Sequence, residues 1–216
     1  GAAMIVKVCG LRDPDNIRAV ERLPVDLCGF IFYPRSPRCV PDDEFHAAAV
    51  RSCRRPAVGV FVNASPAEML RTAERFGLEW LQLHGDESPE ACGELRQRGF
   101  RIIKAIRVAS AGDLAAARAY EDCADYLLFD TRCDGYGGSG RRFDWSVLDG
   151  YRGATPFLLS GGIGPDSLDR LADFRHPLWA GVDLNSRFET APALKDVGLL
   201  SDFIKQYRKQ FKSNNL

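Results

Sequence analysis

Residues 4–11 read MIVKVCGL, a short apolar run that contains one lysine and one cysteine. A run of this kind, closed by a glycine, is typical of a buried strand in a parallel sheet. Because successive side chains of a strand point to opposite faces, Ile5, Lys7 and Cys9 share one face. Lysine is almost never fully buried without a partner. Unless the strand is wrongly assigned, this lysine therefore indicates a functional site, with the Cys9 thiol at the carboxyl end of the strand.

Apolar segments of strand length recur along the rest of the chain. We expect strands at 27–32, 57–62, 80–83, 101–106, 126–129, 156–159 and 178–184. Helical patterns alternate with these strands, and three of them begin with a capping residue followed by proline, at residues 13–14, 65–66 and 88–89. We expect helices at about 13–23, 42–53, 65–76, 110–120, 145–148 and 199–211, with two more that begin at Ser88 and Pro165.

Eight strands that alternate with eight helical segments predict the α/β class and a closed (β/α)8 TIM barrel of parallel strands with outer helices. An open doubly wound sheet alternates in a similar way, but eight units in 216 residues fit closure with little chain left over. We therefore expect one barrel domain over residues 4–212. Residues 1–3 resemble a cloning remnant, and residues 213–216 are expected to form a frayed tail.

The composition limits the classes of partner. The chain has 29 basic and 29 acidic residues, so no overall field attracts nucleic acid or an anionic membrane. Its apolar runs are far shorter than the roughly 20 residues that cross a bilayer. We expect a soluble, cytoplasmic protein that binds neither nucleic acid nor membrane, as a monomer or a homodimer.

The cysteines favour free thiols in a reducing compartment. Their number, seven, is odd, and no CxxC pair occurs. The three histidines are scattered without a ligand partner at metal spacing, so we expect no bound metal. Most of the cysteines lie inside expected strands or helices and are interpreted as small buried hydrophobic residues. Cys9 differs because it ends a strand on the same face as Lys7.

Polar residues follow most of the expected strands. In a (β/α)8 barrel the carboxyl ends of the strands meet at one face, which holds the active site. The residues expected there are Cys9, Arg35, Arg38, Asn63, Gln82, His84, Arg107, Asp130, Ser160, Gly161, Gly162, Asp183, Asn185 and Ser186. Structural alternatives stay open for three of them: His84 as a strand cap, Asn63 as a turn former and Arg107 as a surface charge.

Cys9 and Asp130 are the candidate base and acid. A nearby Lys7 ammonium would raise the thiolate fraction of a thiol whose ordinary pKa is about 8.5. Asp130 can donate a proton near neutral pH only if its pKa is raised, which an apolar pocket does and an adjacent cation undoes. We therefore expect Lys7 to pair with Asp183, since the first and last strands are neighbours in a closed barrel.

Two glycine-rich stretches are interpreted differently. Residues 135–140 match GxGxxG, but no long helix follows and no acid stands about 20 residues on to hold a ribose. A P-loop is excluded because two arginines stand where lysine and serine or threonine belong. We interpret 131–143 as a mobile loop that could close over the site. Residues 160–163 and 185–186 occupy the usual phosphate position of a barrel.

Eight motifs, in order, resemble the phosphoribosylanthranilate isomerase family. They are KVCGL, GFIFYPRSPRCV, VGVFVN, LQLHGDE, FDT, GGSGRRFDW, LLSGGI and GVDLNS. The resemblance covers Ile5 to about Phe211. The resemblance implies a cofactor-free Amadori rearrangement of a phosphorylated small molecule, N-(5-phosphoribosyl)anthranilate, in tryptophan biosynthesis. In it, Asp130 would protonate the ring oxygen and Cys9 would remove the C2′ proton.

The resemblance also implies binding residues. Arg38 would bind the anthranilate carboxylate through the two-point fork of its guanidinium. The phosphate would be held by Gly161, Gly162, Asn185 and Ser186. The substrate site would also include Gln82, His84 and Asp183.

The chain departs from the family pattern after the last strand. Arg187 stands for a glycine in SRFE, and Ala193 and Leu194 stand in PALKD where PGKKD is usual. Arg187 either adds a cation beside the phosphate or cannot adopt a backbone conformation that only glycine allows. Two other functions remain open: a related barrel isomerase of a phosphoribosyl carboxamide, which uses two aspartates, and a non-catalytic barrel that binds a sugar phosphate.

Overall fold

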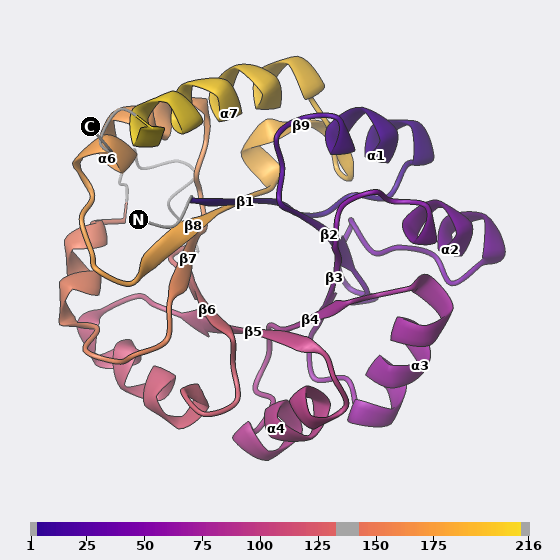
Figure 1. Ribbon diagram of the computed structural model, residues 1–216, viewed down its shortest axis with the longest axis horizontal. Coiled ribbons are helices and arrows are strands. Elements are labelled where there is room, and N and C mark those ends of the chain that lie inside the picture. The colour runs from indigo at the N-terminus through magenta and orange to yellow at the C-terminus, as the bar shows by residue number, and fades with distance from the viewer. Residues whose placement is uncertain (1–3, 133–142, 213–216) are drawn as a thin grey trace.

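The computed structural model describes residues 4–132 and 143–212. Its eight parallel strands close into a barrel in chain order, and helices surround it (Figure 1). The strands are β1 (Ile5–Val8), β2 (Leu27–Ile31), β3 (Ala57–Phe61), β4 (Trp80–Leu83), β5 (Arg101–Arg107), β6 (Tyr126–Asp130), β7 (Phe157–Ser160) and β8 (Trp179–Leu184). The predicted fold is confirmed. The expected cloning remnant, the tail at 213–216 and most of the proposed closing loop lie outside the described residues.

The helices follow the strands as the sequence predicts. They are α1 (Pro14–Glu21), α2 (Glu44–Arg51), α3 (Pro66–Phe76), α4 (Pro89–Gln97), α6 (Leu168–Asp173) and α7 (Val197–Lys212), with the 3-10 helices η1 (Ala111–Tyr120), η2 (Trp145–Gly150), η3 (Pro165–Ser167) and η4 (Ser186–Phe188). The predicted caps form: Asp13, Ser65 and Ser88 each accept a hydrogen bond from a backbone N–H of the first turn. None of the helices in the described part of the chain is long and apolar enough to cross a membrane.

The predicted side-chain alternation of β1 is confirmed. Val6 and Val8 are fully buried in the larger core between the strands and the helices. Ile5 packs instead against the apolar cluster inside the barrel, which contains Leu27, Val58, Ile103, Ala105, Leu128 and Leu158. Lys7 pairs in register with Asp183 of β8. This alternation directs Lys7 into the barrel, above that apolar cluster.

Two segments differ from the prediction. The segment expected as an alanine-rich helix is the 3-10 helix η1, in which Leu114 and Ala117 are buried. Their spacing of three matches the three residues per turn of a 3-10 helix. The stretch after β8, for which no regular structure was predicted, contains a separate antiparallel pair, β9 (Glu189–Ala191) and β10 (Leu194–Lys195). β9 lies beside α1, at the edge of the barrel (Figure 1).

Candidate active site

A cavity of about 390 Å³ lies at the carboxyl ends of the barrel strands. Every residue that was predicted to act in catalysis or binding lines it: Cys9, Arg38, Gln82, His84, Asp130, Gly161, Gly162, Asp183, Asn185 and Ser186. Arg107 and Arg132 also line it, so Arg107 is more than a remote surface charge. Asn63 is not among the lining residues; its left-handed backbone, with φ of 56°, confirms the turn.

The predicted pair of Lys7 and Asp183 is confirmed. Lys7 Nζ donates to Asp183 Oδ1 over 2.9 Å, and the Lys7 side chain is 0% exposed. The second carboxylate oxygen of Asp183 accepts from Ser160 Oγ at 2.9 Å. Burial lowers the pKa of Lys7, but Asp183 and Cys9 outweigh it, so the pKa is raised above the ordinary value. Lys7 is therefore a cation at neutral pH, buried beneath the site.

The Cys9 thiol does not have the low pKa that the sequence suggested. Burial raises the pKa of Cys9, and the Lys7 and Lys195 ammonium groups offset only part of this effect. The expected excess of thiolate in the free protein is therefore wrong, because removal of water outweighs the neighbouring charges. Gly29 of β2 makes room for this thiol, since a Cβ there would lie 2.8 Å from Cys9 Sγ.

Asp130 also differs from its predicted state. Burial raises the pKa of its carboxyl, but the hydrogen bond from His84 and the charge of Arg132 more than offset it, so the pKa lies below the ordinary value. The distances are 3.2 Å from His84 Nε2 and 3.3 Å from Arg132 Nη2 to Asp130 Oδ2. The expected raised pKa is therefore wrong. In the free protein Asp130 is a carboxylate and Cys9 a thiol.

His84 faces the cavity with its ring. Gln82 Nε2 lies 2.9 Å from His84 Nδ1. An amide nitrogen only donates, so Nδ1 must accept, and the proton of the neutral ring is on Nε2, where it points to Asp130. Gln82 thus selects the tautomer that donates to Asp130. A simple role of His84 as a strand cap does not account for these side-chain contacts.

The glycine loop after β7 has the backbone that only glycine adopts readily. Gly161 and Gly162 have φ of 95° and 72°, and a Cβ on Gly161 would lie 2.4 Å from the Arg132 backbone nitrogen. Arg187, in contrast, is not one of the described residues with a positive φ. The alternative that Arg187 stands in a backbone conformation open only to glycine is therefore wrong. Its guanidinium lies beside the loop, donating to Asp166 over 2.7 Å and to the Gly162 carbonyl over 3.2 Å.

The sequence analysis missed two residues of the site, Glu189 and Lys195. Arg38 Nε lies 3.0 Å from both carboxylate oxygens of Glu189, and Arg38 Nη2 lies 2.6 Å from Oε1. Lys195 Nζ lies 2.7 Å from Glu189 Oε2. Lys195 is the lysine of PALKD, but its spacing in the sequence does not show that it lies beside Arg38 and Asn185. Arg38 is thus ion-paired as well as exposed to the cavity.

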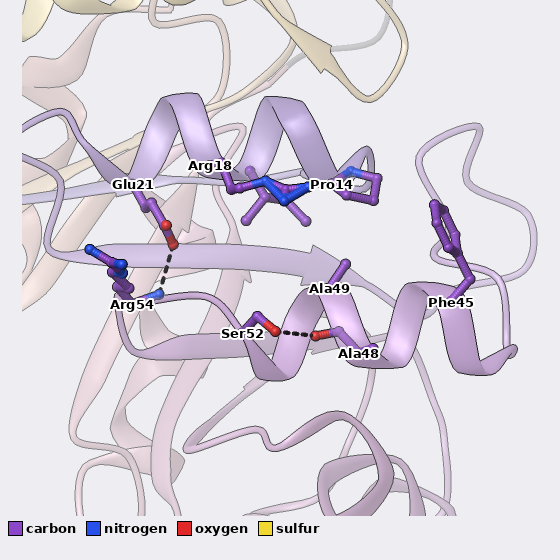
Figure 2. Close-up of a pocket in the computed structure, with 9 residues that line it drawn as sticks. Pro14, Arg18, Glu21, Phe45, Ala48, Ala49, Ser52 and Arg54 are labelled. Carbon is purple, nitrogen blue, oxygen red and sulfur yellow. Dashed lines mark hydrogen bonds between the residues drawn. The ribbon is translucent and has the colours of Figure 1, made fainter.

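A second cavity, of about 430 Å³, lies outside the barrel between α1 and α2 (Figure 2). The Arg54 backbone, just after α2, donates to Glu21 of α1, and Ser52 Oγ donates to the Ala48 carbonyl at the end of α2 itself. Phe45 stands at the edge of the cavity with 67% of its surface exposed. None of the predicted site residues lines this cavity, so the chemistry belongs to the barrel mouth.

Comparisons with known proteins agree on one family. Residues 6–206 match the family model described as N-(5'phosphoribosyl)anthranilate (PRA) isomerase. A protein of that name from Parabacteroides distasonis is 53% identical, with 94% of this chain and 93% of the relative covered. The relative from Phocaeicola vulgatus is 50% identical over 97% of this chain and 100% of its own length.

Solved structures of the family share the fold. The phosphoribosyl anthranilate isomerase of Thermotoga maritima superposes with a TM-score of 0.81 at 32% identity, covering 95% of this chain and 99% of its own. A second isomerase structure, in complex with reduced 1-(o-carboxyphenylamino)-1-deoxyribulose 5-phosphate, gives a TM-score of 0.78 at 30% identity over the same shares. With a family model that covers nearly the whole barrel and relatives of this identity, the chain belongs to the N-(5'-phosphoribosyl)anthranilate isomerase family.

Proposed function

We propose that this chain is a cytoplasmic enzyme of tryptophan biosynthesis that isomerises N-(5'-phosphoribosyl)anthranilate to 1-(2-carboxyphenylamino)-1-deoxyribulose 5-phosphate. The observation that carries the proposal is that Cys9, Asp130 and the Gly161–Gly162 loop open into one cavity. An acid, a base and an anion seat in one cavity suit a single small phosphorylated substrate. The ligand in the related crystal structure has both a carboxylate and a phosphate.

The reaction needs one proton donor and one proton acceptor. Asp130 protonates the furanose oxygen as the C1′–O bond breaks, which leaves a Schiff base with the anthranilate nitrogen. Cys9 then removes the proton from C2′, and the resulting enolamine tautomerises to the ketone. General acid and general base each contribute on the order of 10²- to 10⁴-fold. All the groups that this scheme requires are side chains of the protein.

The resting protonation state differs from the reactive one by the position of a single proton. The free protein holds a Cys9 thiol and an Asp130 carboxylate, whereas the scheme starts from thiolate and carboxylic acid. Both forms carry the same number of protons, so their ratio does not change with pH between the two pKa values. We infer that a minor, constant fraction of the enzyme reacts.

This inference predicts the pH profile. We expect kcat/KM to be level at least from about pH 7 to the ordinary thiol value of 9.0, and to fall only above the raised pKa of Cys9. The sign follows from the raised pKa of Cys9: only above it does the pair lose its shared proton, and Asp130 then has none to donate. Initial rates at constant ionic strength measure the profile. A midpoint near neutral pH that disappears in Cys9→Ser would contradict the assigned protonation.

The activity itself is tested by fluorescence. The substrate is generated from anthranilate and phosphoribosyl pyrophosphate with the corresponding transferase, and its fluorescence decays as it is converted. We expect rapid decay on addition of the protein. The absence of decay at micromolar protein would reject the isomerase and leave a barrel that only binds a sugar phosphate.

Arg38→Ala tests the carboxylate seat. Loss of the guanidinium removes a charged hydrogen bond to the substrate, so we expect KM to rise by about tenfold to a hundredfold, with a smaller change in kcat. Steady-state kinetics measure both constants. A change confined to kcat would contradict a binding role for Arg38.

The oligomeric state is a separate inference. We expect a monomer or a homodimer, and one Thermotoga maritima structure of the family is named as monomers made from a dimeric enzyme. Light scattering of the purified protein distinguishes the two.

A further inference from the structure

The hairpin β9–β10 places two buried charges beside the active site. Glu189 Oε2 and Lys195 Nζ are 2.7 Å apart, and their side chains are 5% and 0% exposed. Asn16 of α1 holds β10 in place: its side-chain amide accepts a hydrogen bond from the Lys195 backbone N–H and donates one to the Lys195 carbonyl. The hairpin is a separate sheet that the barrel does not need for closure. A buried ion pair is weak evidence for stability, so its position needs another explanation.

Lys195 orients Asn185. Lys195 Nζ donates to Asn185 Oδ1 over 2.8 Å. An ammonium only donates, so it takes the carbonyl side of the amide and leaves the NH2 group for other partners. Asn185 lines the same cavity as Gly161 and Gly162. A hydrogen-bond donor at that place suits the acceptor oxygens of a phosphate, whereas the opposite orientation would present an acceptor to it.

Glu189 orients Arg38 in a similar way. It takes up the Nε and Nη2 side of the guanidinium, which leaves Nη1 for a ligand in the cavity. A second carboxylate in the cavity can therefore bind Arg38 without displacing Glu189. The same Glu189 carboxylate binds Lys195, so one ion pair contacts both Arg38 and Asn185.

These groups meet over Gly10, directly after Cys9. A Cβ on Gly10 would lie 2.6 Å from Asn185 Oδ1, 2.9 Å from Arg38 Cδ and 3.2 Å from Lys195 Nζ. Gly10 has φ of 80°, a conformation that suits glycine. The close approach packs Asn185, Arg38 and Lys195 against the end of β1.

Ala193, at the turn of the hairpin, supports the same conclusion. Its φ is 67°, a left-handed backbone that is unfavourable for a residue with a side chain. In this conformation its N–H donates to Glu189 Oε2 over 3.0 Å. Strained backbone persists where the surrounding contacts hold it, commonly at functional sites.

We propose that Lys195 is a positioning residue which, together with Glu189, directs Asn185 to the phosphate and Arg38 to the carboxylate of the same substrate. One buried ion pair thereby sets the distance between the two anion seats. This inference rests on the proposed function, because that function supplies a ligand with an anion at each end.

The test separates the two ends of the substrate with two competitive inhibitors, inorganic phosphate and anthranilate. Lys195→Met removes the ammonium and keeps the chain length. We expect the inhibition constant of phosphate and the KM to rise about tenfold, the loss of one oriented hydrogen bond to an ion, while kcat changes less. Glu189→Gln should raise the inhibition constant of anthranilate more than that of phosphate. Lys195→Arg, which keeps a cationic donor, should recover part of the phosphate affinity.

Arg208→Met is the matched control. Arg208 donates to Asp26 and to the Met4 and Pro24 carbonyls, at the other end of the barrel. Its loss removes a comparable set of hydrogen bonds without contact to the cavity, so both inhibition constants should stay at the wild-type values. If Lys195 has only a structural role, Lys195→Met should likewise leave both inhibition constants at the wild-type values.

Three results would decide the case. A folded Lys195→Met whose inhibition constants stay within about twofold of the wild type would overturn the proposal. If that variant does not fold, Glu189→Gln decides instead: it keeps the shape of the side chain but puts an NH2 donor where one carboxylate oxygen accepts. Unchanged anthranilate inhibition in this variant would overturn the proposal as well. If the wild type binds phosphate by calorimetry but has no isomerase activity, the proposed function fails, and weaker phosphate binding by Lys195→Met still supports the orientation of Asn185.

Discussion

Asp130→Asn is expected to lower kcat by about 10²- to 10⁴-fold, the loss typical of a general acid. Asparagine has the size of aspartate and still accepts a hydrogen bond from His84, whose Nε2 lies 3.2 Å from the carboxylate. It has no proton to give to the ring oxygen. Because the residues proposed to bind the substrate are unchanged, KM should change much less than kcat. Single-turnover fluorescence decay measures the chemical step directly.

Cys9→Ser tests the other half of the same proton pair and should have an effect of similar size. A hydroxyl is a far poorer proton acceptor than a thiolate at neutral pH, although it fits the space that Gly29 leaves. Cys28→Ser is a suitable control, because Cys28 is also fully buried on a neighbouring strand but packs in the outer core. It should lose stability and keep its rate per folded molecule.

Asp144→Asn is the control for Asp130. Asp144 caps η2 through a hydrogen bond from the Ser146 backbone and does not line the cavity. Near-wild-type rates for Asp130→Asn or Cys9→Ser, with circular dichroism showing folded protein, would remove both residues from the mechanism.

The sequence predicts the barrel well because its signals are local. Each strand is an apolar run, and the helices α1 to α4 each follow a residue whose side chain caps the first turn. The position of Lys7 opposite Asp183 also follows, since closure makes the first and last strands neighbours and alternation puts both side chains inside. These steps need only the spacing of residues along one strand and the order of the strands.

The rest depends on contacts that spacing does not encode. Arg38 and Glu189 are 151 residues apart, and Glu189 lies on a strand of three residues without a clear pattern. The protonation of Cys9 depends on how completely water is excluded from it, which outweighs the charge of Lys7. For Asp130 the balance is reversed, because His84 and Arg132 outweigh burial. Identifying the acid and the base from sequence therefore does not establish which of them holds the proton.

Asp183→Asn is expected to lower the free energy of unfolding by about 3–5 kcal/mol, the cost of leaving one partner of a buried ion pair unmatched. Lys7 is 0% exposed, so water cannot replace the lost carboxylate. The pKa of Lys7 is raised in the folded protein, and the stabilisation is therefore fully present below the ordinary value of 10.5 and is lost as pH rises through the folded pKa. Urea unfolding at neutral pH and at high pH measures both effects.

The double variant Lys7→Met/Asp183→Leu separates stability from catalysis. Replacing both partners of a buried pair by apolar residues is often neutral or stabilising, so most of the lost free energy of unfolding should return. Activity should not return in full, because the Lys7 ammonium that lowers the pKa of Cys9 is gone; loss of the Asp183 charge, which raises that pKa, offsets part of the effect. We expect kcat to stay below the wild-type value. The rate of Cys9 alkylation against pH reports the thiol itself. Wild-type activity in the stable double variant would show that Lys7 stabilises the barrel and has no role in catalysis.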